Sequence, residues 1–385
     1  MDFELTDLQK ETRQKAREFA LREFTKEKAL ELDETCSFPY DIWKKACRSG
    51  LIGVHFSTEY GGLGYGITEN LLIVEELCRR DSGIGIALSL ADFSSEVVLR
   101  FGSPEQKQKY LVPVTRGEFI SAGAYTEPDH GSDITLLFTT ATRRRDFWVI
   151  NGTKTFITNG AIADFFVVLC QTDPDSKPPY RGQSTLLMEK GTKGFTATEI
   201  KPKMGIRMTS TAQLSFSDVK VPLVQLIGKE GKGFYQVLEF FDESRIEIAG
   251  QALGVSQGAF DRALDYARNR SQFGKRLVDF QATQHKLADM ATRIESARLL
   301  TYQAACNYDR NRIDPKLTSM AKMHAARTAV EITDEAVEIL GGYGYLADYE
   351  VERFYRDAKI TEIYEGTKEI QKNTIASYLI GRQKE

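Results

Sequence analysis

The chain has 385 residues, more than a single hydrophobic core usually supports, so we expect two or three domains. A formal charge of -3 at pH 7 gives no support for nucleic acid or an anionic membrane surface as a partner. The longest strongly apolar run, Phe165 to Cys170, is far too short to span a bilayer, so no membrane insertion is expected.

Cysteine and histidine usage indicates no metal site. The five cysteines are scattered and never spaced as a metal clip, and the four histidines are far apart without a helical pair. The N-terminus has neither the basic start nor the apolar segment of a secretory signal. We therefore expect free thiols in a protein of the reducing cytoplasm.

The first third of the chain has helical periodicity. Thr6 and Gln9 predict a capping box at the first helix, and helices are expected from Thr68 to Arg80 and over residues 84–100. Ser103-Pro104 predicts the start of another short helix. These elements predict an all-α domain over residues 1–119.

After Gly117 the pattern changes to short segments rich in β-forming residues, separated by Gly, Asn, Asp and Pro. Asn151-Gly152 predicts a tight turn between two of these strands. Strands without intervening helices predict an antiparallel β-barrel or sandwich over residues 120–226. A Rossmann site and a P-loop are not supported, because G-x-G-x-x-G and Walker A patterns are absent.

The last part of the chain returns to long helices. One carries an apolar face from Ile246 to Ala267, and another begins at Asp314-Pro315 and ends at Gly341-Gly342. Three long helices predict a four-helix-bundle-like domain over residues 227–385. The complete expectation is an α+β multidomain protein with the order helices, β domain, helices.

The most informative segment is Ile363 to Gln371. Gly366 permits a break between two helices, and Thr367 is the predicted N-cap of the second. Glu365 then lies in a joint beside Ile363 and Tyr364, where apolar surroundings would raise the pKa of its carboxyl and make it a stronger base. The alternative interpretation is an ordinary acidic residue ahead of a helix N-terminus, where the helix dipole favours it.

This segment resembles the C-terminal signature of acyl-CoA dehydrogenases, I-Y-E-G-T-x-x-I-Q, at every fixed position. Residues 126–133 are similar to the T-E-P-x-x-G-S-D motif of the same family, although Asp129-His130 stand where members usually carry small residues. Similar motifs occur at residues 154–160 (K-x-[WF]-I-[ST]-N-G), 242–245 (D-x-x-R) and 270–275 (R-x-x-F-G-[KR]). The resemblance covers essentially the entire chain.

The resemblance implies an FAD-dependent acyl-CoA dehydrogenase in which Glu365 removes the α-proton of a CoA thioester while the β-hydride passes to the flavin. Some relatives carry this glutamate just before the arginine of D-x-x-R, where this chain has Ser244. The implied cofactor-binding residues are Tyr125, Thr126, Ser132, Phe156, Ile157, Thr158, Arg270, Phe273, Gln281, Glu338, Gly341, Gly342, Thr367 and Glu369. The implied substrate-binding residues are Ser132, Asp242, Arg245 and Gly366.

Two of these positions have simpler explanations. Asp242 and Arg245 are three residues apart and can form an intrahelical ion pair without any ligand. Phe156 can be a core residue of a strand, or serve as both core residue and cofactor contact.

In the family, the positions of Arg270, Gln281 and residues 338–342 contact the flavin of a neighbouring subunit. The resemblance therefore implies a homodimer at least and a tetramer, built as a dimer of dimers, as the expected assembly. Acyl-CoA is the implied substrate, and electron-transferring flavoprotein is the implied electron acceptor.

Asp92 is unusual, because it aligns with a helix that lines the acyl pocket and normally has a small, apolar or hydroxyl residue there. It is a candidate second acid, as in relatives that act on alicyclic acyl-CoAs; a solvated or capping helix residue is the alternative. We expect a short- or medium-chain substrate, or an alicyclic one of the cyclohexane- or cyclohexene-carboxyl-CoA type. An oxidase, a desulfinase and a non-catalytic CoA-ester-binding scaffold remain open as other functions.

Overall fold

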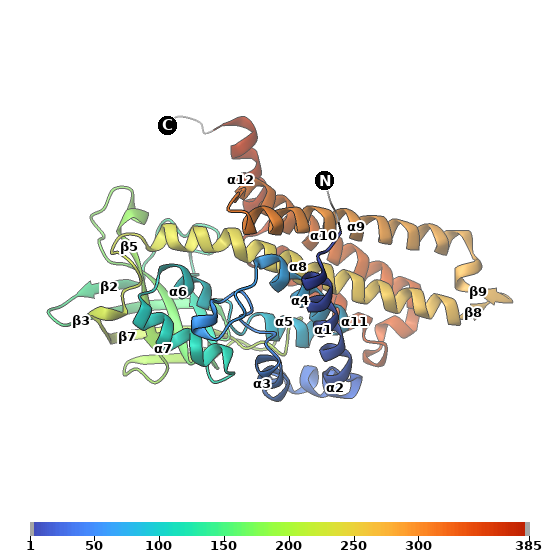
Figure 1. The fold of residues 1–385 in the computed structure, drawn as a ribbon, viewed down its shortest axis with the longest axis horizontal. Helices are drawn as coiled ribbons and strands as arrows, with labels where there is room; N and C mark the ends of the chain where they lie inside the picture. The colour runs from blue at the N-terminus through green and yellow to red at the C-terminus, as the bar shows by residue number, and fades with distance from the viewer. Residues whose placement is uncertain (1–3, 382–385) are drawn as a thin grey trace.

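The computed structural model describes residues 4–381 and has the predicted order of helices, sheet and helices (Figure 1). The α+β multidomain expectation is confirmed. The first region contains α1 (Asp7–Glu23), α2 (Lys26–Thr35), α3 (Tyr40–Arg48), α4 (Ile67–Arg80), α5 (Ser82–Ser89), α6 (Ser95–Phe101) and α7 (Pro104–Thr115). The predicted capping box at Thr6 is present, since the Thr6 hydroxyl accepts from the Gln9 N–H and the Gln9 side-chain oxygen accepts from the Thr6 N–H.

The expectation of one helix over residues 84–100 is wrong. The chain forms α5 and α6 instead, and residues 90–94 between them are not helical. At this break the backbone N–H of Ser95 donates to the Asp92 carbonyl at 2.8 Å, and the Ser121 hydroxyl accepts from the Ser94 N–H. Asp and Ser make such local and side-chain bonds readily, which competes with helix continuation. The break fixes Asp92 in a buried position.

The middle region is one seven-stranded sheet in the order β1-β4-β2-β3-β7-β6, with β5 paired to β4. Most pairs are antiparallel, but β1 runs parallel to β4. Apolar side chains of β3, β4, β5 and β7 form its core, and β4 is buried along its whole length. The strands are β1 (Ser121–Ala124), β2 (Thr140–Arg143), β3 (Phe147–Thr158), β4 (Phe165–Gln171), β5 (Gln183–Glu189), β6 (Phe195–Glu199) and β7 (Thr211–Pro222).

The predicted turn at Asn151-Gly152 is also wrong. β3 continues through both residues, and its pairing with β7 shifts register between Ile150 and Gly152. The Asn151 side chain bonds Asp218 on β7, and a side chain at Gly152 would approach Thr139 to 2.6 Å. The glycine therefore marks a bulge and a close approach of two backbones, which is the other common use of glycine in strands.

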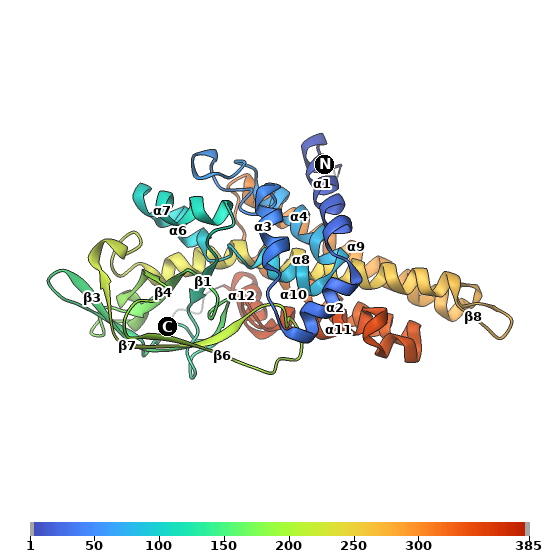
Figure 2. The ribbon, with the colours of Figure 1, turned by 90° about the horizontal axis from the view of Figure 1, so that it is seen from below.

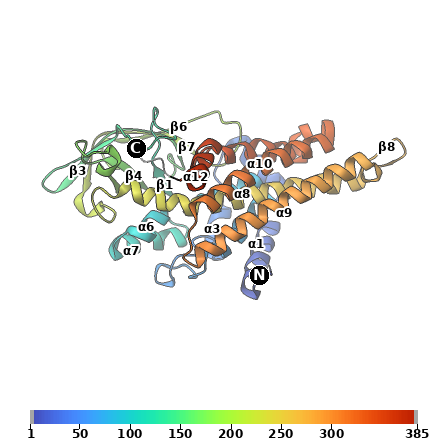
Figure 3. The ribbon, with the colours of Figure 1, turned by 90° about the horizontal axis from the view of Figure 1, so that it is seen from above.

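The last region is built on three long helices. α8 (Gly233–Asn269) packs against α10 (Pro315–Leu340) and α9 (Gln281–Asp309), and α11 (Val351–Ala358) and α12 (Lys368–Ile380) complete the region. As predicted, Asp314 caps α10, accepting from the N–H groups of Lys316 and Leu317. Figures 2 and 3 show α8 running from the sheet at one end of the molecule to the β8–β9 turn (Ser271–Gln272, Lys275–Arg276) at the other.

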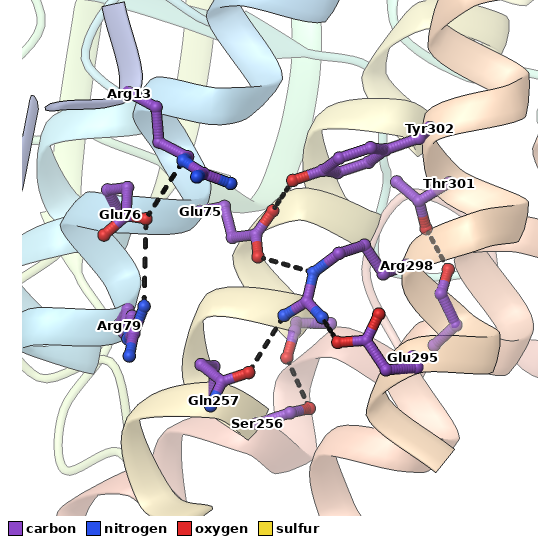
Figure 4. Close-up of polar contacts among 12 residues, drawn as sticks. Arg13, Glu75, Glu76, Arg79, Ser256, Gln257, Glu295, Arg298, Thr301 and Tyr302 are labelled. Carbon is purple, nitrogen blue, oxygen red and sulfur yellow. Dashed lines mark hydrogen bonds and ion pairs between the residues drawn. The ribbon is translucent and has the colours of Figure 1, made fainter. Parts of the chain in front are cut away.

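A buried polar network joins the first helical region to the long helices (Figure 4). Glu75 on α4 accepts hydrogen bonds from the Arg298 Nε atom at 3.1 Å and from the Tyr302 hydroxyl at 2.7 Å, both on α9. Arg298 also bonds Gln257 on α8 at 2.9 Å and contacts Glu295 directly. One carboxylate thus ties α4 to the α8–α9 pair. Within residues 4–381, no helix is both long enough and apolar enough to cross a bilayer.

Candidate active site

Glu365 lies in a short joint between two helices. A 3-10 turn ends at Glu362, and α12 begins at Lys368 with the predicted cap, the Thr367 hydroxyl accepting from the Ile370 N–H. The joint needs left-handed backbone, with φ of 53° at Glu365 and 92° at Gly366. Positive φ at a non-glycine residue is strained and persists only where neighbouring groups enforce it.

Two buried side chains hold this joint. The Gln371 amide donates to the carbonyls of Glu365 and Gly366, each at 3.0 Å. From α10, the Lys322 Nζ atom donates to the Gly366 carbonyl at 2.7 Å. These three bonds fix the backbone that presents the Glu365 carboxylate.

The Glu365 carboxylate itself is held by Ser244 of α8, whose hydroxyl donates to Oε2 at 2.7 Å. Burial raises the pKa of Glu365, while the Ser244 hydrogen bond and the charges of Lys322 and Arg245 oppose that rise. A carboxylate with a raised pKa that still ionises is suited to removing a proton from a weakly acidic carbon. The alternative interpretation, an ordinary acidic residue ahead of α12, does not account for these contacts.

Lys322 was not anticipated from the sequence. It is 1% exposed, and burial lowers its pKa to about 7, against the opposing charge of Glu365. A sequence signal existed, because Lys322 falls on the same buried face of α10 as Ala325, Ala326 and Ala329. A lysine on an otherwise alanine-rich face is expected to have a specific partner.

Among the predicted cofactor residues near the sheet, Tyr125 lies close to this carboxylate. Tyr125 packs on Phe240 and Phe241 of α8, one turn before Ser244, with ring centroids 6.1 Å apart in each case. The Tyr125 hydroxyl is buried, with Ser94 beside it. Thr126 accepts from the Thr155 N–H at 3.0 Å, which brings Phe156 beside it.

The predicted residues of β3 differ in exposure. Phe156 is 67% exposed, with φ of 55°, so its interpretation as a core residue is wrong. The next side chain, Ile157, is packed in the core of the sheet, and Thr158 is half-buried. The exposed ring of Phe156 offers a face on which a flat aromatic cofactor such as the flavin of FAD can pack.

A buried ion pair shapes the loop that carries Thr126 and Ser132. Lys154 donates to Glu127 at 2.9 Å and to the Tyr125 carbonyl at 3.1 Å. The Glu127 carboxylate also accepts hydrogen bonds from the N–H groups of Phe138 and Thr139, at 2.7 and 2.9 Å. Ser132 itself is exposed on this loop. The turn that contains the unusual Asp129-His130 is therefore anchored by the buried carboxylate of Glu127.

A second group of predicted residues lies at the opposite end of the chain's long axis. Arg270 follows Ser244 by 26 residues along α8, or about 39 Å at 1.5 Å per residue. Around it a surface hollow of about 450 Å³ is lined by aromatic and glycine residues, including Tyr266, Gly341, Gly342 and Tyr343. Phe273, Gln281 and Glu338 are also exposed in this end of the molecule. One chain does not bring these residues to Glu365.

Arg270 has no ion-pair partner within the part of the chain that is described, and its guanidinium lies 5.5 Å from the centre of the Tyr343 ring. An exposed guanidinium without a carboxylate beside a hollow fits a phosphate group, which it can bind through two parallel hydrogen bonds. The predicted residues near each end of α8 thus have features that fit a part of FAD.

The predicted substrate residues Asp242 and Arg245 form the intrahelical ion pair at 3.3 Å, beside Ser244. Of the remaining predicted residues of the joint, Thr367 is half-buried and Glu369 is exposed. The structure therefore gathers Glu365, Gly366, Arg245 and Tyr125 around one place, while Arg270 lies at the far end of α8.

Asp92 is neither solvated nor a helix cap. It is 9% exposed, and its Oδ2 atom accepts from the Gly53 N–H at 2.9 Å. Burial raises the pKa of its carboxyl. The alternative interpretation of Asp92 is therefore wrong, and a buried carboxyl here needs another account.

A helical region, a sheet region and a helical bundle, with a buried carboxylate at a helix joint, match the arrangement expected of a CoA-ester oxidoreductase. Family models for the N-terminal, middle and C-terminal domains of acyl-CoA dehydrogenase match residues 6–118, 122–219 and 231–380. The chain belongs to the acyl-CoA dehydrogenase family, whose members are flavin-dependent oxidoreductases.

Relatives and solved structures agree with this family. The chain is 46% identical to a short-chain specific acyl-CoA dehydrogenase of Clostridium acetobutylicum, covering 98% of this chain and 99% of that protein. It superposes on butyryl-CoA dehydrogenase from Megasphaera elsdenii with a TM-score of 0.94 and 39% identity, over 99% and 100% of the two chains. A chain from a structure described as the electron transferring flavoprotein of Acidaminococcus fermentans gives a TM-score of 0.96 and 41% identity, with coverage of 99% and 100%.

Proposed function

We propose that this enzyme removes the α-proton and the β-hydride of a short-chain acyl-CoA to give the 2-enoyl-CoA, with Glu365 as the base. The observation that carries the proposal is the joint at Glu365. Its strained backbone is enforced by Lys322 and Gln371, and its carboxylate is aimed by Ser244. Such bonds hold a base in one orientation, which lowers the cost of reaching a reactive geometry.

FAD, when bound, supplies the acceptor for the β-hydride. The chain's own residues hold the substrate between that acceptor and Glu365, which takes the α-proton onto its carboxylate as the Cα–H bond breaks. In this proposal the backbone N–H of Glu365 donates to the thioester carbonyl, where negative charge develops. Ser244 stays bonded to Oε2, so the other carboxylate oxygen, Oε1, is left for the proton.

We propose that two chains share each FAD. Tyr125, Thr126, Ser132 and Phe156–Thr158, with Thr367 and Glu369, would hold the ring and ribityl part. The partner subunit would supply the equivalents of Arg270, Phe273, Gln281, Glu338, Gly341 and Gly342. Support comes from the separation of about 39 Å along α8 between the two groups. A homodimer is then the smallest complete enzyme, and a dimer of dimers is the expected assembly in the cytoplasm.

The names of the relatives support a short acyl chain as the substrate, because one is a butyryl-CoA dehydrogenase and another is a short-chain specific acyl-CoA dehydrogenase. The match to a chain described as an electron transferring flavoprotein supports that class of protein as the electron acceptor. These assignments come to the present chain by similarity.

One observation favours a second candidate, the oxidation of an alicyclic acyl-CoA. Asp92 places a second buried carboxyl on the segment expected to line the acyl group. A carboxylate there can remove a proton from a ring carbon that Glu365 does not reach. The same Asp92 carboxylate has no evident use with a butyryl chain.

Anaerobic titration of the holoenzyme tests both candidates, with flavin bleaching as the signal. Butyryl-CoA should bleach the wild type and Asp92→Asn equally. Cyclohex-1-ene-carboxyl-CoA should bleach the wild type but not Asp92→Asn if the enzyme is alicyclic. No bleaching by any acyl-CoA, or a colourless protein, would favour a binding scaffold; rapid reoxidation of the reduced flavin in air would favour an oxidase.

A further inference from the structure

A second cluster of titratable side chains lies beyond Glu365 and contains His55, Glu96 and Glu243. The His55 Nε2 atom contacts Glu96 directly and lies 4.0 Å from a Glu243 oxygen. The ligand-type atoms of the three side chains all lie within 4.8 Å of one another. Their side chains are 7%, 7% and 5% exposed, so the cluster is inside the protein.

A metal ion is a poor occupant for this cluster. Arg100 contacts Glu243 directly, and the Tyr308 hydroxyl donates to the same Glu243 oxygen at 2.8 Å. A dication bound to Glu243 would stand beside the Arg100 guanidinium and compete with both donors. The donors already present satisfy the carboxylate, which leaves proton exchange as the chemistry open to the cluster.

The cluster is joined to Asp92 through two segments. The loop that carries His55 also carries Gly53, whose N–H donates to Asp92 at 2.9 Å. On the other side, Glu96 follows Asp92 by four residues, at the start of α6. Asp92 and the His55–Glu96 pair are therefore held by the same two pieces of chain.

On α8, Glu247 links this cluster to the catalytic joint. It lies one turn from Ser244 and one turn from Glu243 on the same helix, and its Oε1 atom is buried without a partner among residues 4–381. Burial raises the pKa of Glu247 well above its ordinary value, and the charges of Asp92, Glu243, Glu96 and Glu365 raise it further. Glu247 therefore stays protonated, and it lies between the cluster and Glu365.

Burial raises the pKa values of the two carboxyl groups of the cluster. Burial raises the pKa of Glu96 to about 7, against the opposing charge of Arg100, and raises that of Glu243 well above its ordinary value. The His55 Nδ1 atom is buried and has no hydrogen-bond partner among residues 4–381. The ring is therefore held through its Nε2 atom, which faces Glu96, while its Nδ1 atom is left without a partner.

The cluster is connected to the protein surface through Arg100 and Tyr308. Arg100 is 22% exposed and stacks on Tyr308, with its guanidinium carbon 5.2 Å from the ring centre. Tyr308, on α9, is half-buried. The groups that contact Glu243 therefore reach from the interior to the solvent.

We propose that His55, Glu96 and Glu243 form a proton relay. The relay accepts the proton that Asp92 has taken up during turnover of an alicyclic acyl-CoA. This inference rests on the proposed role of Asp92. Asp92, as the carboxylate, takes a proton from a ring carbon; the electron pair of that C–H bond forms the new ring C=C bond as a hydride leaves the ring for the bound FAD. The proton then passes to the His55–Glu96 pair, and Asp92 returns to the carboxylate. The relay loses the proton to water at the Arg100–Tyr308 side.

Steady-state kinetics of the holoenzyme test the relay, with cyclohex-1-ene-carboxyl-CoA and butyryl-CoA as the two substrates. His55→Gln and Glu96→Gln should each lower kcat on the ring substrate at least tenfold at pH 7. Both should leave its KM, and kcat on butyryl-CoA, within twofold of wild type. His324→Gln and Glu331→Gln, on α10, are the matched controls and should change neither substrate.

Several outcomes would overturn the relay. Unchanged ring turnover in both variants would do so, and so would a parallel loss on both substrates, which indicates a structural role. If the variants do not fold, the wild-type pH profile decides. Ring turnover should then fall as the pH drops through about 7, since the acceptor must be unprotonated, in a limb absent with butyryl-CoA. Identical profiles would overturn the relay.

Asp92→Asn separates failure of the relay from failure of the proposed function. If this variant oxidises the ring substrate at the wild-type rate, the role of Asp92 is wrong and the relay falls with it. If it loses ring activity while His55→Gln and Glu96→Gln keep theirs, Asp92 is the base and only the relay is wrong.

Discussion

The Ser244 hydroxyl of α8 donates a 2.7 Å hydrogen bond to the Oε2 atom of Glu365, across 121 residues of sequence. This bond favours the ionised form of a carboxyl whose pKa burial raises. It sets the pH range in which Glu365 can act as a base, because the base must be unprotonated to accept the α-proton.

Ser244→Ala should therefore move the acid limb of the pH profile upward. Loss of a hydrogen bond to a charged group, worth about 1.5 kcal/mol, corresponds to a shift of about one pH unit. The measurement is kcat against pH with butyryl-CoA. Ser256→Ala is the matched control, since within residues 4–381 its hydroxyl, on the same helix, bonds only the Ala252 carbonyl. An unshifted limb in Ser244→Ala would mean that this bond does not tune Glu365.

Lys322→Met should change how stability depends on pH. Burial lowers the pKa of Lys322 to about 7, whereas an unfolded lysine keeps its proton to above pH 10. Between these values the unfolded chain binds more protons, so the wild type gains stability as the pH rises above 7. Met does not titrate, so the variant lacks this gain.

Denaturant midpoints at pH 6.5, 7.5 and 8.5 measure the effect of Lys322→Met. The difference in free energy of unfolding between wild type and variant should widen in favour of the wild type as the pH increases. Lys286→Met, at a surface pair with Glu335, should follow the wild type. A constant difference across the three pH values would contradict the assigned protonation of Lys322.

Gly366→Ala should damage the joint that carries Glu365. The φ of 92° strains any side chain there, and a Cβ atom would lie 2.6 Å from the Gln371 Nε2 atom that fixes the joint. We expect kcat to fall at least tenfold, since small displacements of a base cost about that much or more. Gly191→Ala shares the positive φ, 81°, but has no atom within 4 Å. It should lose about 1 kcal/mol of stability and keep its activity.

Glu75→Ala should lower the free energy of unfolding more than a surface substitution does. It removes the one buried carboxylate of the network that pairs with Arg298 and accepts from the Tyr302 hydroxyl, at a cost of about 3 kcal/mol, and leaves Arg298 with Gln257 and the exposed Glu295. Glu295→Ala removes a different partner of the same guanidinium, but Glu295 is 63% exposed, so it should cost less than about 1 kcal/mol. Equal losses in the two variants, measured by chemical denaturation, would show that the network in Figure 4 does not depend on Glu75.

Local patterns in the sequence predicted much of the fold. Thr6, Thr367 and Asp314 each act within one helical turn, and the structure has all three caps. The order of helical and strand periods likewise gave the three regions. The failures at residues 84–100 and at Asn151-Gly152 arose where tertiary contacts, with Gly53 and with Thr139 and Asp218, override the local preference.

The candidate site was less predictable, because its contacts are distant in sequence. Ser244 was noted only as the absence of a second glutamate, and its bond to Glu365 depends on the packing of α8 against the joint. The partners of His55 are 41 and 188 residues away, which no spacing rule connects. Glu243 and Glu247 at helical spacing were the available signal for an acidic face on α8.

The central claim is that Glu365 takes the α-proton, and one titration tests it most directly. Glu365→Gln should fold, bind FAD and fail to bleach under anaerobic conditions with butyryl-CoA. Glu362→Gln, whose carboxylate pairs with Lys359 and lies in the same segment, should bleach as the wild type does. Bleaching of Glu365→Gln at a rate near that of the wild type would contradict the account.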